Sequence, residues 1–195
     1  MIQSKRRYTK TTDSKHWMKK HPNLLKDYSA VQENEVFVSD ITYVESAESV
    51  NYLSLVTDAY TRQIKGYKLS SDMRAENVVQ ALHMAMKHMK DRATTMIHHS
   101  ERGSQYCSEL YQSALHHYGV CPSMTDGYLA KQCFSYQNAL AERVNGILKQ
   151  EFLTTRCKTK EELEHLIAES VIIYNCYRPH LSLNMLTPNQ MYEKE

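Results

Sequence analysis

The sequence predicts an α/β domain built on a mixed five-stranded sheet that is flanked by helices. Two observations lead to this fold class. Three strand-like segments follow one another through short links, which is typical of an antiparallel meander. Beyond them, segments with helical spacing alternate with two further short apolar segments, which is typical of strands joined by helices.

The first three strands are predicted from apolar and β-branched residues between positions 36 and 69. The first strand covers Val36–Val44 and contains an acid, Asp40, in its middle. The second and third strands are Asn51–Thr57 and Gln63–Leu69. All three are rich in residues that favour extended backbone, and polar residues separate them.

The remaining elements follow from helical spacing and short apolar runs. In chain order, they are a helix over Ala75–Lys90, a strand over Ala93–Ile97, a helix over Ser104–Tyr118 that Gly119 closes, a strand over Val120–Met124, a loop over 125–137, and helices over Asn138–Phe152 and Lys160–Asn175. This order of strands and helices is that of a ribonuclease-H-like sheet.

The composition is that of a globular protein, with 42% apolar and 24% charged residues among 195. No apolar run approaches the roughly 20 residues that span a membrane, and we expect no signal peptide at the N-terminus. The five cysteines contain no Cys-x-x-Cys pair. A structural zinc site is therefore not expected, and reduced cytosolic thiols are the default.

Residues 1–33 are predicted to form a basic arm or linker, and residues 34–192 the folded core. The first 27 residues hold eight Lys and Arg against two Asp, a net charge of +6, whereas the whole chain carries only +2. A cationic arm on a mildly acidic body suits a protein whose arm neutralises phosphates and whose body collects carboxylates for metal. A solubilising tail explains the same charge equally well.

Three acids are candidate metal ligands and catalytic residues. Asp40 lies inside an apolar strand, where a carboxylate is costly unless it is paired or bound to metal. Glu101 follows the fourth strand, and Glu142 lies on the helix over 138–152. Hard divalent cations such as Mg²⁺ and Mn²⁺ prefer oxygen ligands, and a pair of them can promote phosphoryl transfer. Taken alone, Asp40 is equally consistent with a structural acid, whereas a solvated role is the simpler interpretation of Glu101 and of Glu142.

The helix predicted over 138–152 has two distinct faces. Its apolar stripe, which we expect to pack on the sheet, consists of Leu140, Val144, Ile147 and Leu148. A polar face carries Asn138, Glu142, Asn145 and Lys149. On that face a carboxylate can reach metal while the lysine reaches a nearby phosphate, although an exposed Glu/Lys face is the simpler interpretation.

Other polar residues suggest supporting roles. His98 and His99 are expected to form stabilising hydrogen bonds, because neutral imidazole is a poor ligand for Mg²⁺. Asp58, at the end of the second strand, is expected to cap a turn. The candidate DNA contacts, each equally consistent with a solvated charge, are Arg102, Lys131, Arg143 and Lys149.

Several motifs recur together in a characteristic order. They are Asp40–Tyr43, Tyr52–Asp58, His99–Tyr106, Asn138–Arg143 with Leu148–Glu151, and Tyr174–His180 with Leu183 and Pro188. In these motifs, the chain resembles the catalytic subunit of the insertion-sequence transposases of the IS-three group, which belong to the retroviral-integrase-like superfamily. The resemblance covers roughly residues 35–192.

The resemblance implies a ribonuclease-H-like core with three acids, at positions 40, 101 and 142, and two ions of Mg²⁺ or Mn²⁺. It implies cleavage of double-stranded DNA at the ends of an element, followed by attack of the freed 3′-hydroxyl on another phosphodiester. It also implies a homo-oligomer on DNA, a helix-turn-helix partner subunit and a bacterial cytoplasmic location at the nucleoid when bound to DNA. This sequence is expected to contain only part of the family's N-terminal helical region.

Two features depart from the family pattern. Glu101 stands where the family has Asp, and its extra methylene matters because catalytic geometry tolerates errors of only about 0.5 Å. The spacing of 40 residues between Glu101 and Glu142 is also longer, with the surplus around Leu129–Phe134. Two alternatives therefore stay open: a catalytically impaired relative that binds DNA or partner subunits, and a nuclease that does not join strands.

Overall fold

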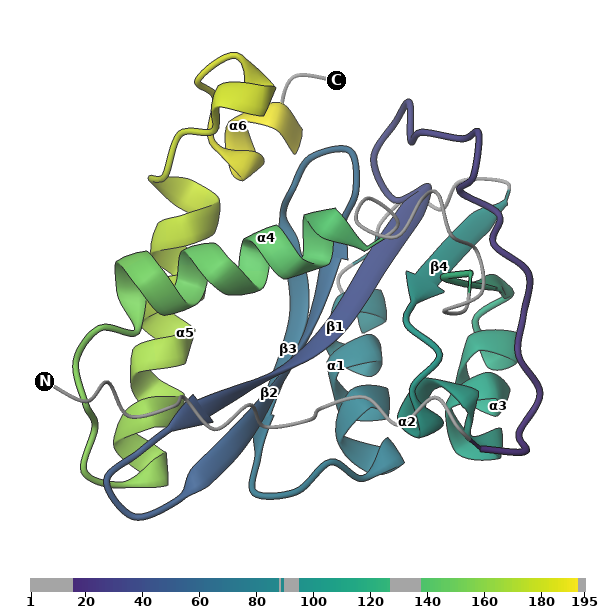
Figure 1. Ribbon diagram of the computed structural model, residues 1–195. Coiled ribbons are helices and arrows are strands. Elements are labelled where there is room, and N and C mark those ends of the chain that lie inside the picture. Colours follow the sequence, from purple (N-terminus) through teal and green to yellow (C-terminus); the bar gives the residue numbers. More distant parts are fainter. Residues whose placement is uncertain (1–15, 88, 90–94, 127–137, 193–195) are drawn as a thin grey trace, which may run out of the picture.

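The computed structural model describes residues 16–87, 89, 95–126 and 138–192 (Figure 1). Its five strands are β1 (Val36–Glu45), β2 (Val50–Asp58), β3 (Ile64–Ser70), β4 (Met96–Ser100) and β5 (Val120–Met124). They form one sheet in the order β3-β2-β1-β4-β5. The first three strands pair antiparallel, whereas β4 is parallel to β1 and β5 is parallel to β4. The predicted mixed sheet is confirmed.

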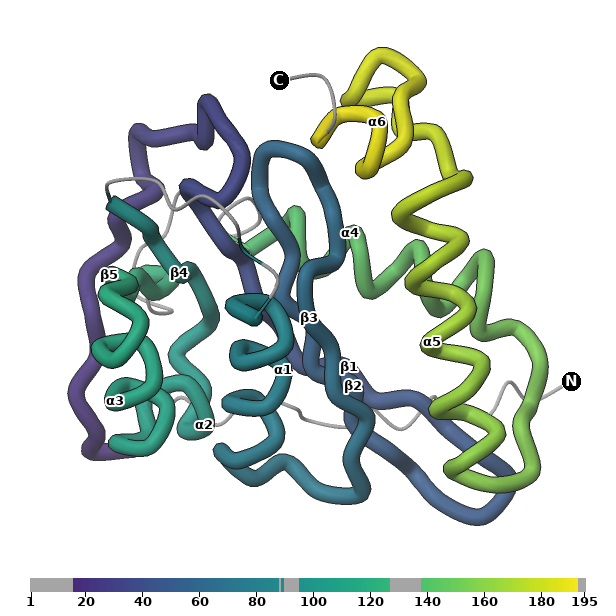
Figure 2. The backbone as a smooth tube through the Cα atoms, turned by 180° about the vertical axis from the view of Figure 1, so that it is seen from behind, coloured from purple at the N-terminus to yellow at the C-terminus, as the bar shows by residue number. Residues whose placement is uncertain are grey.

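Helices cover both faces of the sheet (Figures 1 and 2). One face carries α1 (Ala75–Lys87), α2 (Ser104–Cys107) and α3 (Glu109–His117), and the other carries α4 (Ala139–Ile147) and α5 (Lys160–Cys176). A π-helical turn over Leu148–Phe152 continues α4, and a 3₁₀ turn over Leu181–Leu183 precedes α6 (Pro188–Tyr192). Side chains along β1 point alternately to the two faces of the sheet, so that Phe37 packs towards α1 and Val38 packs towards α4.

Two predicted boundaries are wrong. The helix predicted over Ser104–Tyr118 is broken at Ser108, whose extended backbone (φ −62°, ψ 147°) ends α2. The Ser108 hydroxyl then accepts a hydrogen bond of 3.2 Å from the Tyr111 N–H and caps α3. β4 also extends to Ser100, so that His98 and His99 lie inside the strand and not in the loop that follows it.

Asp58 is fully buried and ties three segments together. One carboxylate oxygen accepts hydrogen bonds from the N–H groups of Tyr60 (2.9 Å) and Thr61 (2.7 Å), and from the Thr61 hydroxyl (3.0 Å). The other accepts a 2.6 Å bond from the Asn34 N–H. The turn-capping role predicted for Asp58 is confirmed, and it extends to the chain segment that enters β1.

The described part of the arm, residues 16–33, contains no regular helix or strand and packs along the core (Figures 1 and 2). The Met124 N–H at the end of β5 donates to the Pro22 carbonyl (3.2 Å). The Leu24 N–H donates to the Ser123 hydroxyl (2.9 Å). The segment therefore covers part of the outer edge of the sheet, where unpaired backbone groups would otherwise be exposed.

No helix in the described part of the chain has both the length and the apolar character that crossing a membrane requires.

The contact of β3 with α1 depends on Gly66. A Cβ atom at this position would lie 2.1 Å from the Ala81 carbonyl oxygen and 2.8 Å from the Ala85 nitrogen, both of which are backbone atoms. Helix α1 can therefore approach the sheet this closely only where β3 has no side chain.

Replacement of Gly66 by alanine is expected to destabilise the domain by about 1–3 kcal/mol, because the helix backbone must move away. Gly146→Ala is the matched control, since a Cβ at that helical glycine meets no atom within 4 Å. The control should be neutral or stabilising by up to about 1 kcal/mol. Thermal unfolding of the two variants measures the difference, and equal stabilities would contradict the packing described for α1.

Candidate active site

The parallel pairing of β1 with β4 places two of the three predicted acids side by side. The register aligns Ser39 with Ser100, so the next positions along the two strands are Asp40 and Glu101. Aligned residues of neighbouring strands point to the same face of a sheet. The negative charge of Glu101 contributes to a raised pKa of Asp40, which agrees with this proximity.

The carboxylate of Asp40 has a strongly perturbed environment. Burial raises its pKa to about 7, and the charges of Glu101 and, more weakly, Glu142 act in the same direction. Two hydrogen bonds of 2.8 Å oppose this shift, one from the Ile41 N–H and one from the Asn145 side-chain amide. Asp40 is therefore protonated more readily than an ordinary aspartate, and a nearby cation would favour its charged form.

Helix α4 is fixed to β1 on both sides of Glu142. The Asn138 side chain donates to the Ser39 carbonyl (3.3 Å), and the Asn145 side chain donates to Asp40 (2.8 Å). Glu142 lies between these residues on the same helix face, at helical spacings of four and three. Its side chain is exposed, and its pKa is raised by partial burial and by the charge of Glu101.

The three carboxylates are thus coupled electrostatically without forming a closed ligand cage. Among the described residues, no three His, Cys, Asp or Glu side chains form a group that could hold a metal ion alone. The nearby donors are carboxylate oxygens, which suit a hard divalent cation. Mg²⁺ usually takes one or two carboxylates and completes its coordination with water and substrate phosphates. The residues at positions 40, 101 and 142 therefore fit such an ion in an open site.

Of the predicted DNA contacts, Lys149 is under the influence of the charge of Asp40. Its ammonium group is 4.0 Å from the centre of the Tyr43 ring. Burial lowers its pKa, while the charges of Asp40 and Glu45 oppose the shift. Arg143 is exposed on α4, and Arg102 is partly buried directly after Glu101. Two predicted features lie outside the described residues: Lys131, and the longer spacing around Leu129–Phe134.

A second layer of buried polar groups lies beneath Asp40. The Nε2 atom of His98 is 2.8 Å from both the Ser39 hydroxyl and the Tyr111 hydroxyl, and burial lowers the pKa of His98 to about 3. His99 Nδ1 lies 2.8 Å from the Ser123 hydroxyl. The prediction that both histidines form hydrogen bonds is confirmed. This layer holds the backbone of β1 and β4 where the acids emerge.

Sequence reasoning assigned no role to Ser39, Tyr111 or Asn145. Asn145 had a usable signal, because it shares the polar helix face with Glu142. Ser39 and Tyr111 had none, since a serine inside a strand and a tyrosine in an amphipathic helix are common. Their role depends on the long-range contact of each with His98.

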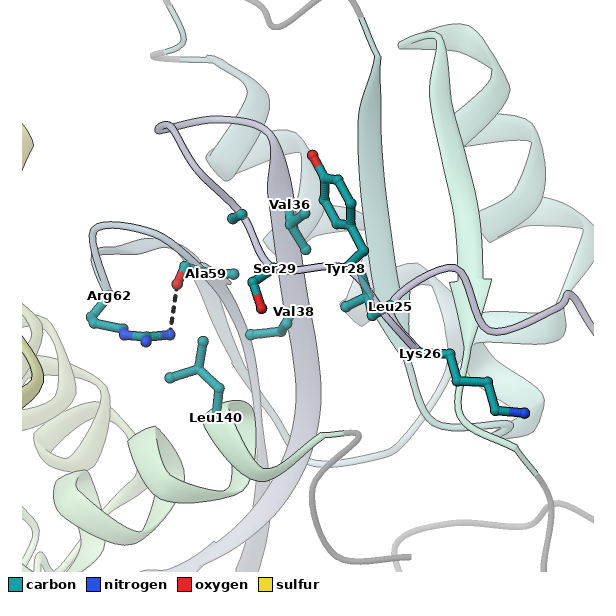
Figure 3. Close-up of a pocket in the computed structure, with 10 residues that line it drawn as sticks. Leu25, Lys26, Tyr28, Ser29, Val36, Val38, Ala59, Arg62 and Leu140 are labelled. Carbon is teal, nitrogen blue, oxygen red and sulfur yellow. Dashed lines mark hydrogen bonds between the residues drawn. The ribbon is translucent and has the colours of Figure 1, made fainter. Parts of the chain in front are cut away.

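A hollow of about 320 Å³ lies on the α4 face of the sheet, beside the first half of β1 (Figure 3). Val36, Val38 and Leu140 form apolar walls, and Arg62 lies at one side with its Nη1 donating to the Ala59 carbonyl (2.6 Å). A second hollow of about 300 Å³ contains Lys149 and Arg156. None of the three acids lines either hollow.

Comparisons with known proteins identify the family. The chain matches the integrase core domain over residues 30–128 and a second integrase core domain family over residues 120–188. An IS600 protein of Shigella sonnei, described as an uncharacterized 31 kDa protein, is 35% identical over 193 residues, which cover 97% of this chain and 69% of the relative. Transposase InsF for IS3A of Escherichia coli is 32% identical over 192 residues, covering 97% of this chain and 65% of InsF.

A putative transposase of IS986/IS6110 from Mycobacterium tuberculosis is 36% identical over 124 residues, which are 62% of this chain and 43% of that protein. The chain thus spans 43–69% of the length of these relatives.

Solved structures show the same fold. An intasome of simian T-cell lymphotropic virus, in complex with a PP2A regulatory subunit, matches with a TM-score of 0.70 at 15% identity, over 95% of this chain and 62% of that one. The HTLV-2 integrase catalytic core in complex with magnesium matches with a TM-score of 0.64 at 14% identity, over 83% and 97%. These integrase cores have the ribonuclease-H-like fold. The chain belongs to the integrase core domain family and, within it, to the insertion-sequence transposases of the IS-three group.

Proposed function

We propose that this chain cleaves DNA at the ends of an insertion sequence and transfers the freed 3′ end to a second DNA. The observation that carries the proposal is the convergence of three acids from separate elements. Asp40 and Glu101 are adjacent through the β1–β4 register, and Glu142 lies on a helix that Asn145 ties to Asp40. Because the chain belongs to a transposase family, we assign these three acids to DNA cleavage and strand transfer.

We propose that Asp40, Glu101 and Glu142 are the catalytic residues and hold Mg²⁺ or Mn²⁺, with two ions as the expected number. Such ions, when bound, activate the attacking oxygen and stabilise the leaving oxygen of a phosphodiester. The raised pKa of Asp40 supports the assignment, because it marks a carboxylate that lacks a compensating positive charge.

The other residues of the site would orient the acids and the DNA. The Asn145 amide fixes one oxygen of Asp40. Lys149 is held above Tyr43, where its ammonium group can pair with a DNA phosphate. Arg102 and Arg143 are proposed as further phosphate contacts, and Lys131 stays a prediction.

Double-stranded DNA is the proposed substrate and target, and we propose that the chain works as a homo-oligomer assembled on it. The family supports both statements in outline. A helix-turn-helix partner subunit and a bacterial location at the nucleoid stay predictions from the resemblance.

Strand transfer on labelled element-end DNA tests the activity directly. Glu142→Gln is expected to reduce joined products by roughly 100-fold or more, because the site loses one carboxylate ligand. Glu109→Gln, an exposed acid at the start of α3 on the other face, is the matched control and should retain activity. Wild-type protein that binds DNA without nicking or joining it would contradict the catalytic proposal.

Glu101→Asp separates an active enzyme from an impaired one in the same assay. If the chain tolerates glutamate at this position, the variant and the wild type should give yields within about tenfold of each other. Activity in Glu101→Asp alone would identify this chain as an impaired relative. Nicked DNA without joined products would identify a nuclease.

Metal binding is expected to depend on pH through Asp40. The folded pKa of about 7 exceeds the unfolded value of about 3.9, so the domain loses stability as pH rises through this interval. Mg²⁺ binds the charged carboxylate, and its effect on the unfolding temperature should therefore be larger at pH 8 than at pH 6. Asp40→Asn should abolish the Mg²⁺ effect and gain stability over wild type at pH 8. An equal Mg²⁺ effect in Asp40→Asn would exclude Asp40 as a ligand.

Lys149→Gln is expected to weaken DNA binding and to reduce the slope of log affinity against log salt by about one. Lys87→Gln is the control, because Lys87 is exposed at the end of α1 on the opposite face of the sheet. Fluorescence anisotropy at several salt concentrations measures both slopes, and identical slopes for the two variants would remove Lys149 from the DNA-binding surface.

A further inference from the structure

Trp17 is the only tryptophan of the chain, and its side chain is 94% exposed. It is the most exposed large apolar side chain in the described part of the molecule. Tryptophan has a large apolar surface that usually packs against protein. An almost fully exposed tryptophan therefore indicates a surface that binds another molecule.

The residues on both sides of Trp17 are anchored, and this holds its indole outward. His16 Nε2 donates to the Arg102 carbonyl (3.0 Å), and Met18 packs against the core beneath α1 and α3. Arg102 directly follows Glu101. The residue before Trp17 is therefore hydrogen-bonded to the loop that carries the second acid of the site.

The surroundings of Trp17 are positively charged. Lys19 and Lys20 follow it in the sequence, and the Lys20 ammonium donates to the His16 carbonyl (3.0 Å). Burial raises the pKa of the Cys107 thiol, and the charges of Lys20 and Arg102 both oppose that shift, so both cations lie on the α2 side of the molecule. The sequence before Trp17 contains five more basic residues and one acid.

We propose that Trp17 stacks on an unpaired nucleobase of the DNA whose phosphodiester lies at the acid site, while Lys19 and Lys20 pair with neighbouring phosphates. An aromatic face among cations is the combination that binds single strands, since the base stacks and the backbone is neutralised. Inside an intact duplex the base faces are already stacked, so the site selects an open end or a single-stranded flank. The inference rests on the proposed function and adds the form of DNA that the site accepts.

A protein partner fits this surface less well. A docking patch for protein has an apolar centre from which charged residues are depleted, whereas Lys19 and Lys20 lie two and three residues after Trp17. The isolated indole and its cations match a nucleotide, which carries one flat apolar base for each phosphate.

The single tryptophan makes the experiment direct, because all indole emission reports on position 17. Labelled DNA is titrated without divalent metal, and anisotropy and tryptophan emission are recorded together for a single strand, a duplex with a mismatched end and a blunt paired duplex. We expect the first two DNAs to quench the tryptophan emission.

Trp17→Ala should weaken the binding of these two DNAs at least fivefold and the binding of the blunt duplex less than twofold. Trp17→Phe should retain most of the affinity. Tyr177→Ala, which removes another exposed aromatic ring at the end of α5, should change nothing.

The outcomes separate the two proposals. Suppose that anisotropy shows DNA binding, that tryptophan emission does not change, and that Trp17→Ala binds DNA with the affinity of the wild type. These results would overturn the stacking and leave the proposed transposase function intact. Emission that depends on protein concentration and not on DNA would overturn it in favour of contact between copies of the chain. Failure of all three DNAs to bind would contradict the DNA function and the stacking together.

Discussion

The solvation of one carboxylate, that of Asp40, governs the arrangement of the elements around it. A charged oxygen at the middle of the central strand is unfavourable in an apolar sheet unless donors or a cation surround it. The Ile41 N–H and the Asn145 amide supply two donors, and the second of these fixes α4 across β1. Glu101 acts in the opposite direction and leaves the site short of positive charge. Electrostatic repulsion between the acids and burial of Asp40 thus destabilise the folded domain locally, and a divalent ion at this place would reduce that destabilisation.

The rest of the site is built so that it does not supply that charge itself. The buried His98 is kept neutral by burial and contacts the Ser39 and Tyr111 hydroxyls. The ammonium group of Lys149 is held against the Tyr43 ring.

The sequence was sufficient for the sheet, its mixed pairing and the polar face of α4, because period-two and helical spacings are local properties. It missed the break at Ser108, where a hydroxyl caps a new helix inside a continuous apolar pattern. It placed His98 and His99 beyond the strand because polar residues rarely fill a buried strand, and their partners, Ser39, Tyr111 and Ser123, are distant in sequence. The proximity of Asp40 to Glu101 required the β1–β4 register, which no local pattern contains.

The docking of residues 16–33 on β5 has a consequence for how the chain folds during synthesis. The Leu24 N–H bonds to Ser123, which the ribosome adds 99 residues later. This segment is made before its partner strand, which exists only after most of the sheet has been translated. Its docking is thus among the late steps of folding, and until then the outer edge of β5 is unprotected.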